Sequence, residues 1–380
     1  AYENLGELIL SERGIPLCSE PPYPQFFQKW GFCSEKSGTQ KEFTYCRWIS
    51  NSVASLVVAS ISGIRGIFNQ DLLPPDIIRY CRNFAALTNS PQVLLARDTR
   101  TTGTAISKAA ASAILREGMD VLDFGVISTP AVFRESRLRK RPAIIITASH
   151  NEPEWNGLKF LVNGSGIQNV ELERILEKKR LPHKEASSGR MKRVERFSYD
   201  EDILRAHGEG SCDGVKVVLD INGGAAFRHV PTILQRLGCK VTSIGDTPSV
   251  FSRTVDPTTD DLEMLSKVVV NRDAHIGLAF DCDGDRLVIV DNEGTKRSGD
   301  FMLTLALKRL FSESPGESVV VSVDTTLAVQ EVVEEAGGRS YESKVGEANV
   351  LKAMIEKNAR FGGEGSSGGG AASSRSPNLS

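Results

Sequence analysis

The chain has 380 residues, of which 40% are hydrophobic and 25% are charged, so its composition is that of a globular protein with two or three domains. Its formal net charge of -2 gives no overall basic field, which argues against a nucleic acid or an anionic membrane as a partner. The longest apolar run, at residues 53–61, is too short to cross a bilayer, and the seven cysteines are sparse, so we expect a cytoplasmic protein with reduced thiols.

Residues 1–50 differ in character from the rest of the chain. They hold three cysteines, Cys18, Cys33 and Cys46, together with several aromatic residues and a proline-rich turn. A zinc site would need paired cysteines or histidine ligands, and this segment has no Cys-x-x-Cys pair and no histidine. We therefore interpret residues 1–50 as an atypical, foreign or poorly ordered extension.

From about residue 52 onward, short apolar runs alternate with amphipathic stretches, a pattern typical of α/β layers with largely parallel strand pairing. In the first unit this pattern predicts strands at residues 93–96, 121–124 and 142–147 and a helix at 105–116. A charged stretch without predicted strands, residues 176–196, is interpreted as a linker or interdomain helix.

Two further units follow the charged stretch. The second is predicted to have strands at 215–220, 240–244, 276–280 and 287–290, a turn at 222–224 and a helix at 230–237. The third is predicted to have helices at 301–311 and 327–336 around a strand at 319–323. After residue 361 the chain is rich in glycine and serine, a composition that cannot build a core, so we expect a flexible tail there.

The strongest chemical motif is the acidic run DCDGDR at residues 281–286, between two predicted apolar strands. Alternate side chains of an extended chain share a face, so Asp281, Asp283 and Asp285 are expected to converge on one point. Three converging carboxylates repel one another unless a cation neutralises them, and hard oxygen ligands suit Mg²⁺. The alternative is a solvated acidic turn, which the apolar flanks disfavour.

A second motif, TASHN at residues 147–151, directly follows a predicted strand. Ligand sites of α/β sheets gather at the carboxyl ends of strands, so Ser149 beside His150 is a candidate nucleophile or phosphoryl carrier. The alternative for Ser149 is a helix cap or turn residue, and for His150 a hydrogen-bonded structural histidine. Lys159, in the run NGLK at 156–159, is either a general acid/base or a surface lysine.

Two weaker features accompany these motifs. Arg65, Arg97 and Arg100 are predicted to lie in short loops, where the fork of a guanidinium suits phosphate oxygens, although a loop arginine is usually a solvated charge. The run GEGS at residues 363–366 offers Glu364 and Ser366 to sugar hydroxyls, with a flexible Gly/Ser linker as the alternative.

The motifs TASHN, NGLK, DCDGDR and GEGS, in this order over about residues 62–366, resemble those of the α-D-phosphohexomutase superfamily, which includes phosphoglucomutases, phosphomannomutases and phosphoglucosamine mutases. The resemblance implies consecutive three-layer α/β/α domains with mixed, mostly parallel sheets. The expected boundaries are 1–50 for the extension, 51–190 for domain 1 with the phosphoserine loop, 191–297 for domain 2 with the metal loop, 298–366 for an incomplete domain 3 with the sugar-binding loop, and 367–380 for a flexible tail, with the fourth domain of the family absent.

The same resemblance implies the roles of individual residues. Ser149 would be the phosphoserine, and Asp281, Asp283 and Asp285 would hold one Mg²⁺ per chain together with a phosphate oxygen of that serine. The remaining site residues would be Arg65 and Arg286 beside the transferring phosphoryl group, Lys159 and His150 for proton transfer and phosphate contact, and Glu364, Ser366 and Glu347 for the sugar.

The implied reaction interconverts hexose 1-phosphate and hexose 6-phosphate, with a hexose 1,6-bisphosphate as intermediate and activator. The hexose and the oligomeric state stay open, and without a fourth domain we expect weakened activity. Two alternatives remain. One is a haloacid-dehalogenase-type phosphatase that uses Asp281 as nucleophile and Asp283 as acid/base, and the other is a non-catalytic remnant that binds sugar phosphates.

Overall fold

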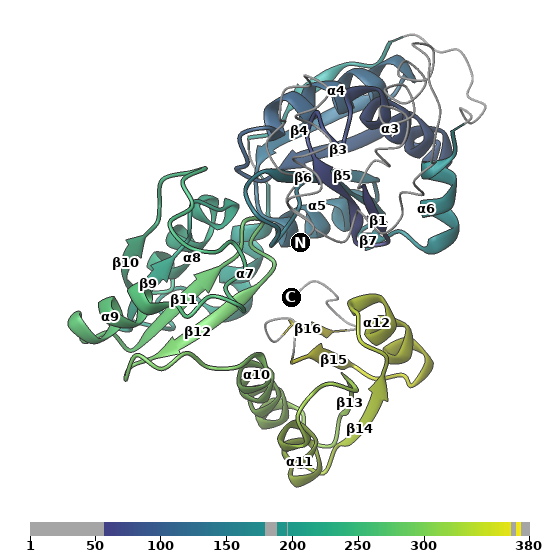
Figure 1. Ribbon diagram of the computed structural model, residues 1–380. Coiled ribbons are helices and arrows are strands. Elements are labelled where there is room, and N and C mark those ends of the chain that lie inside the picture. Colours follow the sequence, from purple (N-terminus) through teal and green to yellow (C-terminus); the bar gives the residue numbers. More distant parts are fainter. Residues whose placement is uncertain (1–56, 179–187, 196, 366–369, 374–380) are drawn as a thin grey trace, which may run out of the picture. The chain divides into compact units, whose positions relative to one another are not determined.

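The computed structural model of the protein describes residues 57–178, 188–195, 197–365 and 370–373, so the expected extension at residues 1–50 lies outside this part of the chain. The described residues form three β-sheets in succession, each with helices packed against it (Figure 1). This arrangement confirms the α/β fold class that the sequence predicts. In the part of the chain that is described, no helix has both the length and the apolarity that a bilayer crossing requires.

The first sheet has eight strands in the order β1-β2-β6-β5-β3-β4-β8, with β7 paired to β6. The central strand β3 pairs in parallel with β4 and β5, and β4 pairs in parallel with β8, while β2, β6 and β5 form antiparallel pairs. The strands are β1 (Val58–Ser60), β2 (Gly63–Ile67), β3 (Gln92–Arg97), β4 (Asp120–Val126), β5 (Ala143–Ile146), β6 (Trp155–Val162), β7 (Ser165–Gly166) and β8 (Met191–Arg193).

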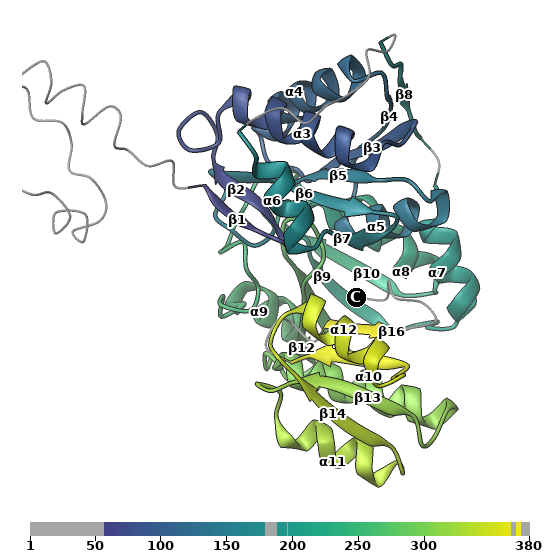
Figure 2. The same ribbon diagram turned by 90° about the vertical axis from the view of Figure 1, so that its right-hand side faces the viewer.

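Both faces of the first sheet are covered by helices, so its central strands are apolar at successive positions. In β5, Ile144 and Ile146 belong to the core formed with α3 (Pro74–Thr88), α4 (Gly103–Arg116) and α6 (Asn169–Leu176). Ala143 and Ile145 belong to the core on the opposite face, where α5 (Thr129–Arg139) packs (Figure 2). Strand β5 is therefore anchored on both faces just before the serine motif.

The second sheet has the order β10-β9-β11-β12. Its strands are β9 (Lys216–Asp220), β10 (Lys240–Ile244), β11 (Ile276–Phe280) and β12 (Leu287–Asp291), and its helical segments are α7 (Tyr199–His207), the 3-10 helix η2 (Ala225–Arg228), α8 (Val230–Arg236) and α9 (Glu263–Asn271). Apolar residues of α9 pack on one face and those of α8 on the other. The acidic motif joins β11 to its antiparallel neighbour β12.

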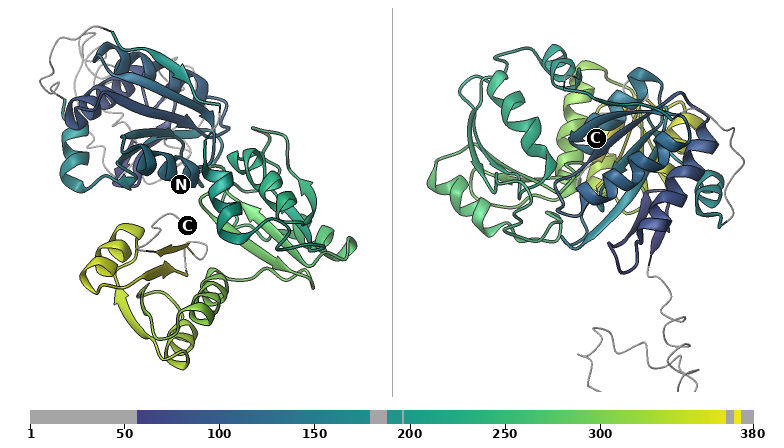
Figure 3. Two further views of the ribbon diagram at one scale, coloured as in Figure 1. Left: turned by 180° about the vertical axis from the view of Figure 1, so that it is seen from behind. Right: turned by 90° about the horizontal axis from the view of Figure 1, so that it is seen from above.

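The third sheet has the order β14-β13-β15-β16. Its strands are β13 (Ser318–Ser322), β14 (Arg339–Ser343), β15 (Phe361–Glu364) and β16 (Gly370–Ser373), and its helices are α10 (Gly299–Glu313), α11 (Leu327–Glu335) and α12 (Glu347–Glu356). Val319 and Val321 of β13 pack with α10 and α11, whereas Val320 packs with α12. In Figure 3, the helix α12 lies on one face of this sheet, and α10 and α11 lie on the other. The side chain of Ser298 caps α10 by accepting a hydrogen bond from the N–H of Phe301.

Three sequence predictions about the fold are wrong. The stretch 176–196, expected to have no strand, contains β8, which pairs with β4 while its side chains stay exposed. Residues 370–373 of the expected flexible tail form β16, which pairs with β15. Arg65 lies in β2 and Arg97 ends β3, so neither is a loop residue. Both missed strands are held by main-chain hydrogen bonds at sheet edges, which leave no apolar periodicity in the sequence.

Candidate functional site

The serine motif and the acidic motif meet in the structure, although they lie in different sheets of one compact unit that spans Ser55–Ser380. The Oγ of Ser149 lies 3.1 Å from the Oδ2 of Asp281 and 3.5 Å from the Oδ1 of Asp285. Ser149 follows β5 and Asp281 follows β11, so both motifs lie at the carboxyl ends of strands. The hydroxyl of a buried serine thus faces a group of carboxylates.

Asp281, Asp283 and Asp285 converge, with one carboxylate oxygen of each within 4.8 Å of the others. The reason given by the sequence analysis is wrong, however, because these residues form a tight loop and not an extended strand. The Oδ1 of Asp281 accepts the main-chain N–H groups of Asp285 and Arg286, each at 3.1 Å, and Gly284 has a φ of +70°. The loop therefore closes on the carboxylate of its own first residue.

The surroundings of Asp281 and Asp283 shift their pKa values in opposite directions. Burial raises the pKa of Asp281 well above its ordinary value, and the charges of Asp285 and Asp283 raise it further. Burial opposes ionisation of Asp283 too, but the charge of Lys159 and a hydrogen bond from Thr129 lower the pKa of that residue. The buried Oδ1 of Asp283 has no hydrogen-bond partner among the described residues. Converging carboxylates with one bare oxygen fit a hard divalent cation.

Cationic side chains surround the two loops. Lys159 of β6 places its Nζ 3.0 Å from the Oδ2 of Asp285 and 3.6 Å from the Oδ2 of Asp283. Arg65 donates to the Oδ1 of Asn151 at 2.9 Å, and burial lowers its pKa. Arg286 donates to the carboxylate of Asp256, a residue that the sequence analysis missed, at 2.6 Å. These cations offset part of the negative charge of the acidic loop.

His150 lies beside the serine hydroxyl. Its Nδ1 is 3.3 Å from the Oγ of Ser149. Burial lowers the pKa of His150, and the nearby charges of Arg286 and Arg65 lower it further, so the neutral ring is favoured at pH 7. A neutral imidazole at this distance can accept a proton from the serine hydroxyl.

Of the expected sugar-binding residues, Glu364 is the one whose side chain the structure describes. Glu364 ends β15, is 8% exposed, and accepts a hydrogen bond from the main-chain N–H of Gly346 at its Oε1. Ser366 and the side chain of Glu347 lie outside the described residues. The role of Glu364 therefore stays a prediction.

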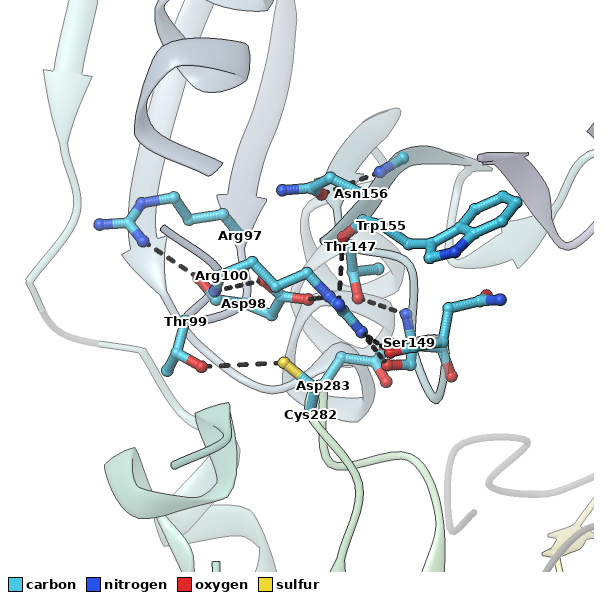
Figure 4. A network of polar contacts seen from close by, with 12 residues as sticks. Arg97, Asp98, Thr99, Arg100, Thr147, Ser149, Trp155, Asn156, Cys282 and Asp283 are labelled. Carbon is cyan, nitrogen blue, oxygen red and sulfur yellow. Dashed lines mark hydrogen bonds and ion pairs between the residues drawn. The ribbon is translucent and has the colours of Figure 1, made fainter. Parts of the chain in front are cut away.

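Two supporting residues escaped the sequence analysis because their roles depend on tertiary contacts. Thr129, at the start of α5, donates its hydroxyl to the Oδ2 of Asp283 at 2.6 Å and its main-chain N–H to the carbonyl oxygen of the same residue at 2.8 Å. Asp98 pairs with Arg100 within the first sheet's loop network (Figure 4). A lone threonine or an Asp-x-Arg triplet gives no signal by which these contacts could have been found in one sequence.

Arg100 does not have the phosphate-facing role considered for it in the sequence. Its side chain is completely buried, and all of its guanidinium nitrogens donate to oxygen atoms of the protein (Figure 4). A guanidinium has five N–H donors, and five bonds are formed here, so none is left for a phosphate. The prediction of a loop arginine that binds phosphate is therefore wrong for Arg100.

Comparison with known families agrees with this geometry. The chain matches the family models of phosphoglucomutase/phosphomannomutase α/β/α domains I, II and III at residues 59–181, 202–294 and 298–377, respectively. Three such domains define the class of the α-D-phosphohexomutases, as the resemblance of the motifs implied. The chain belongs to the phosphoglucomutase/phosphomannomutase family of intramolecular phosphotransferases.

Individual curated relatives are identical to this chain at about a third of the aligned positions. A probable phosphoglucosamine mutase of Methanopyrus kandleri is 32% identical over 318 residues, which cover 80% of this chain and 69% of that protein. A phosphoglucosamine mutase of Moorella thermoacetica is 36% identical over 319 residues, covering 80% of this chain and 71% of that protein. The crystal structure of a phosphoglucomutase/phosphomannomutase family protein of Burkholderia thailandensis superposes with a TM-score of 0.72 at 26% identity, covering 83% of this chain and 73% of that one.

Proposed function

We propose that this protein interconverts hexose 1-phosphate and hexose 6-phosphate through a phosphorylated Ser149. The observation that carries the proposal is the distance of 3.1 Å between the Oγ of Ser149 and the carboxylate of Asp281, which puts a buried hydroxyl next to a candidate cation site. In the first half-reaction the phosphoryl group of Ser149 passes to the free hydroxyl of the hexose phosphate. The bisphosphate then reorients, and its other phosphoryl group returns to Ser149.

The residues expected to hold Mg²⁺ are Asp281, Asp283, Asp285 and Ser149. The bound ion would neutralise charge on the transferring phosphoryl group. In the second half-reaction the hydroxyl of Ser149 loses its proton, and the Nδ1 of His150, at 3.3 Å, is the proposed acceptor. Arg65, Arg286 and Lys159 add positive charge around the same point, which favours phosphoryl oxygens there.

The sugar is proposed to contact Glu364, Ser366 and Glu347 in the third domain. Phosphoglucosamine mutases are prominent among the relatives, so glucosamine phosphate is the first substrate to test, with glucose and mannose phosphates beside it.

The function is tested by incubating the protein with Mg²⁺ and radiolabelled glucose 1,6-bisphosphate. An acid-stable phosphate that peptide mapping places on Ser149, together with conversion of a hexose 1-phosphate, is the expected result. A hydroxylamine-labile phosphate on Asp281 would instead support the phosphatase alternative. Binding of hexose phosphates without any phosphoryl transfer would leave the non-catalytic alternative.

A further inference from the structure

The backbone of Ser149 has a conformation that its side chain disfavours. Its φ is +50°, in the left-handed region that residues with a Cβ rarely adopt. Such a conformation persists only where the surrounding structure determines it strongly. The contacts of the two peptide groups that flank Ser149 show what holds it.

On the carboxyl side of Ser149, Arg100 grips the loop. Its two terminal nitrogens donate to four main-chain carbonyl oxygens, those of Ser149 at 2.7 Å, Asn151 at 2.6 Å, Glu152 at 2.5 Å and Trp155 at 3.0 Å. Its Nε donates to the Oδ2 of Asp98 at 3.1 Å. One planar guanidinium therefore fixes the path of the chain over residues 149–155.

On the amino side, the N–H of Ser149 donates to the Oγ1 of Thr147 at 2.8 Å. The Thr147 side chain is in turn hydrogen-bonded to the carboxylate of Asp98. The Oδ1 of Asp98 also accepts a hydrogen bond from the main-chain N–H of Arg100 at 2.9 Å. The carboxylate of Asp98 therefore contacts both Arg100 and Thr147, the two residues that bind the main chain on either side of Ser149 (Figure 4). Both peptide groups of Ser149 are held, while its Oγ remains directed at Asp281.

We propose that Arg100 is a positioning residue for phosphoryl transfer, which holds Ser149 in its left-handed conformation and so aims the hydroxyl at the acidic loop. The proposal rests on the proposed function of Ser149. Lysine would keep the charge, but its single nitrogen cannot replace the two terminal nitrogens that donate to four carbonyl oxygens here. A positive charge alone is therefore not enough to hold the Ser149 backbone, and the planar geometry of the guanidinium is also required.

The test compares the wild type with Arg100→Lys and a matched control, Arg82→Lys. Arg82 also pairs through its Nε with a buried carboxylate of the first domain, that of Glu117 at 2.5 Å, and its contact does not involve the serine loop. The rate of phosphoryl transfer from glucose 1,6-bisphosphate to Ser149 is followed by intact mass at several bisphosphate concentrations. Since misplacement of a reacting group by about 1 Å costs on the order of 100-fold, Arg100→Lys should lower the saturated rate by about that factor and leave half-saturation unchanged.

A second measurement does not depend on activity. Hydrogen exchange of peptides covering residues 147–155 should become faster in Arg100→Lys, while exchange in β3 and α4 of that variant, and exchange of residues 147–155 in Arg82→Lys, stays as in the wild type. Unchanged exchange in this loop overturns the positioning role, whether or not the wild type accepts phosphate. If the wild type accepts none while the loop does loosen, the proposed function fails and the role of Arg100 in holding Ser149 stands. Transfer by Arg100→Lys within twofold of the wild type also overturns the proposal.

Discussion

The serine loop (residues 147–151) and the acidic loop (residues 281–286) meet at one site, but different kinds of contact hold each of them in place. The serine loop is held from outside, by the buried guanidinium of Arg100 and the carboxylate of Asp98, and these two charges compensate each other. The acidic loop is held by its own backbone, through the N–H groups that Asp281 accepts, and its carboxylates repel one another. The charges that hold the serine loop are paired within the protein, whereas the converging carboxylates of the acidic loop lead us to expect that a bound cation would stabilise it.

The two loops also differ in their dependence on the neighbouring domain. The contacts that fix the serine loop come from residues 98–147 of its own domain. The acidic loop, in contrast, contacts residues of the first domain. The hydroxyl of Thr129 donates to the carboxylate of Asp283, and the Oγ1 of Thr99 lies 3.7 Å from the Sγ of Cys282. Separation of the two domains would therefore disturb the acidic loop more than the serine loop.

The largest effect is expected for removal of the acceptor hydroxyl. Ser149→Ala should abolish phosphoryl transfer from glucose 1,6-bisphosphate, because it removes the hydroxyl that lies against Asp281. Intact mass spectrometry reads the result, and Ser312→Ala, which removes an exposed hydroxyl of α10, is the control that should label normally. Acid-stable labelling of Ser149→Ala would show that another residue carries the phosphate.

The next effect concerns the acidic loop. Asp281→Asn replaces a buried carboxylate whose pKa is raised because burial and the neighbouring carboxylates disfavour its ionised form, and it leaves an amide oxygen to accept the N–H groups of Asp285 and Arg286, so the metal-free stability should rise. Thermal unfolding with EDTA measures this rise. Added Mg²⁺ should stabilise the wild type and not the variant, because only a folded state that binds the ion gains from it.

The control for that change is Asp273→Asn, which neutralises a carboxylate that is 94% exposed. This variant should keep the stabilisation by Mg²⁺. An equal loss of the Mg²⁺ effect in both variants would mean that net charge, and not the converging carboxylates, governs the response.

A smaller effect tests how the first domain supports the acidic loop. Thr129→Val removes the hydroxyl that donates to Asp283 while keeping the volume, so Mn²⁺ affinity should fall about tenfold, as for other partners that orient a metal ligand. Thr129→Ser retains the hydroxyl and should bind within about twofold of the wild type, measured by calorimetry or electron paramagnetic resonance. Wild-type affinity in Thr129→Val would remove Thr129 from the support of the site.

The smallest expected effect uses Cys282 as a reporter inside the acidic loop. Burial raises the pKa of the Cys282 thiol well above its ordinary value, so it should react with a thiol reagent far more slowly than the partly exposed Cys212. Mg²⁺ should slow the reaction by a further few-fold, on the order of the added stability of the loop. Peptide mapping after timed labelling distinguishes the two cysteines, and equal rates would show that the loop opens freely.

The motifs and most strands could be predicted from the sequence because the patterns that indicate them lie within a few neighbouring residues. The run AIII at residues 143–146 predicted a buried strand, and DCDGDR predicted a group of converging carboxylates, and both are present. The contact between Ser149 and Asp281 joins residues 132 positions apart and followed only from the family resemblance. The grip of Arg100 and the support from Thr129 depend on tertiary distances to main-chain and side-chain oxygens, for which a single sequence holds no pattern.

The left-handed backbone at residue 149 bears on the choice of the acceptor itself. A threonine would offer the same hydroxyl, but a β-branched side chain at positive φ crowds its own carbonyl oxygen and is a rare outlier in proteins. The residue at this position must therefore tolerate a positive φ and also provide a reactive hydroxyl. Serine is the hydroxyl amino acid with the smallest side chain, and it meets both requirements.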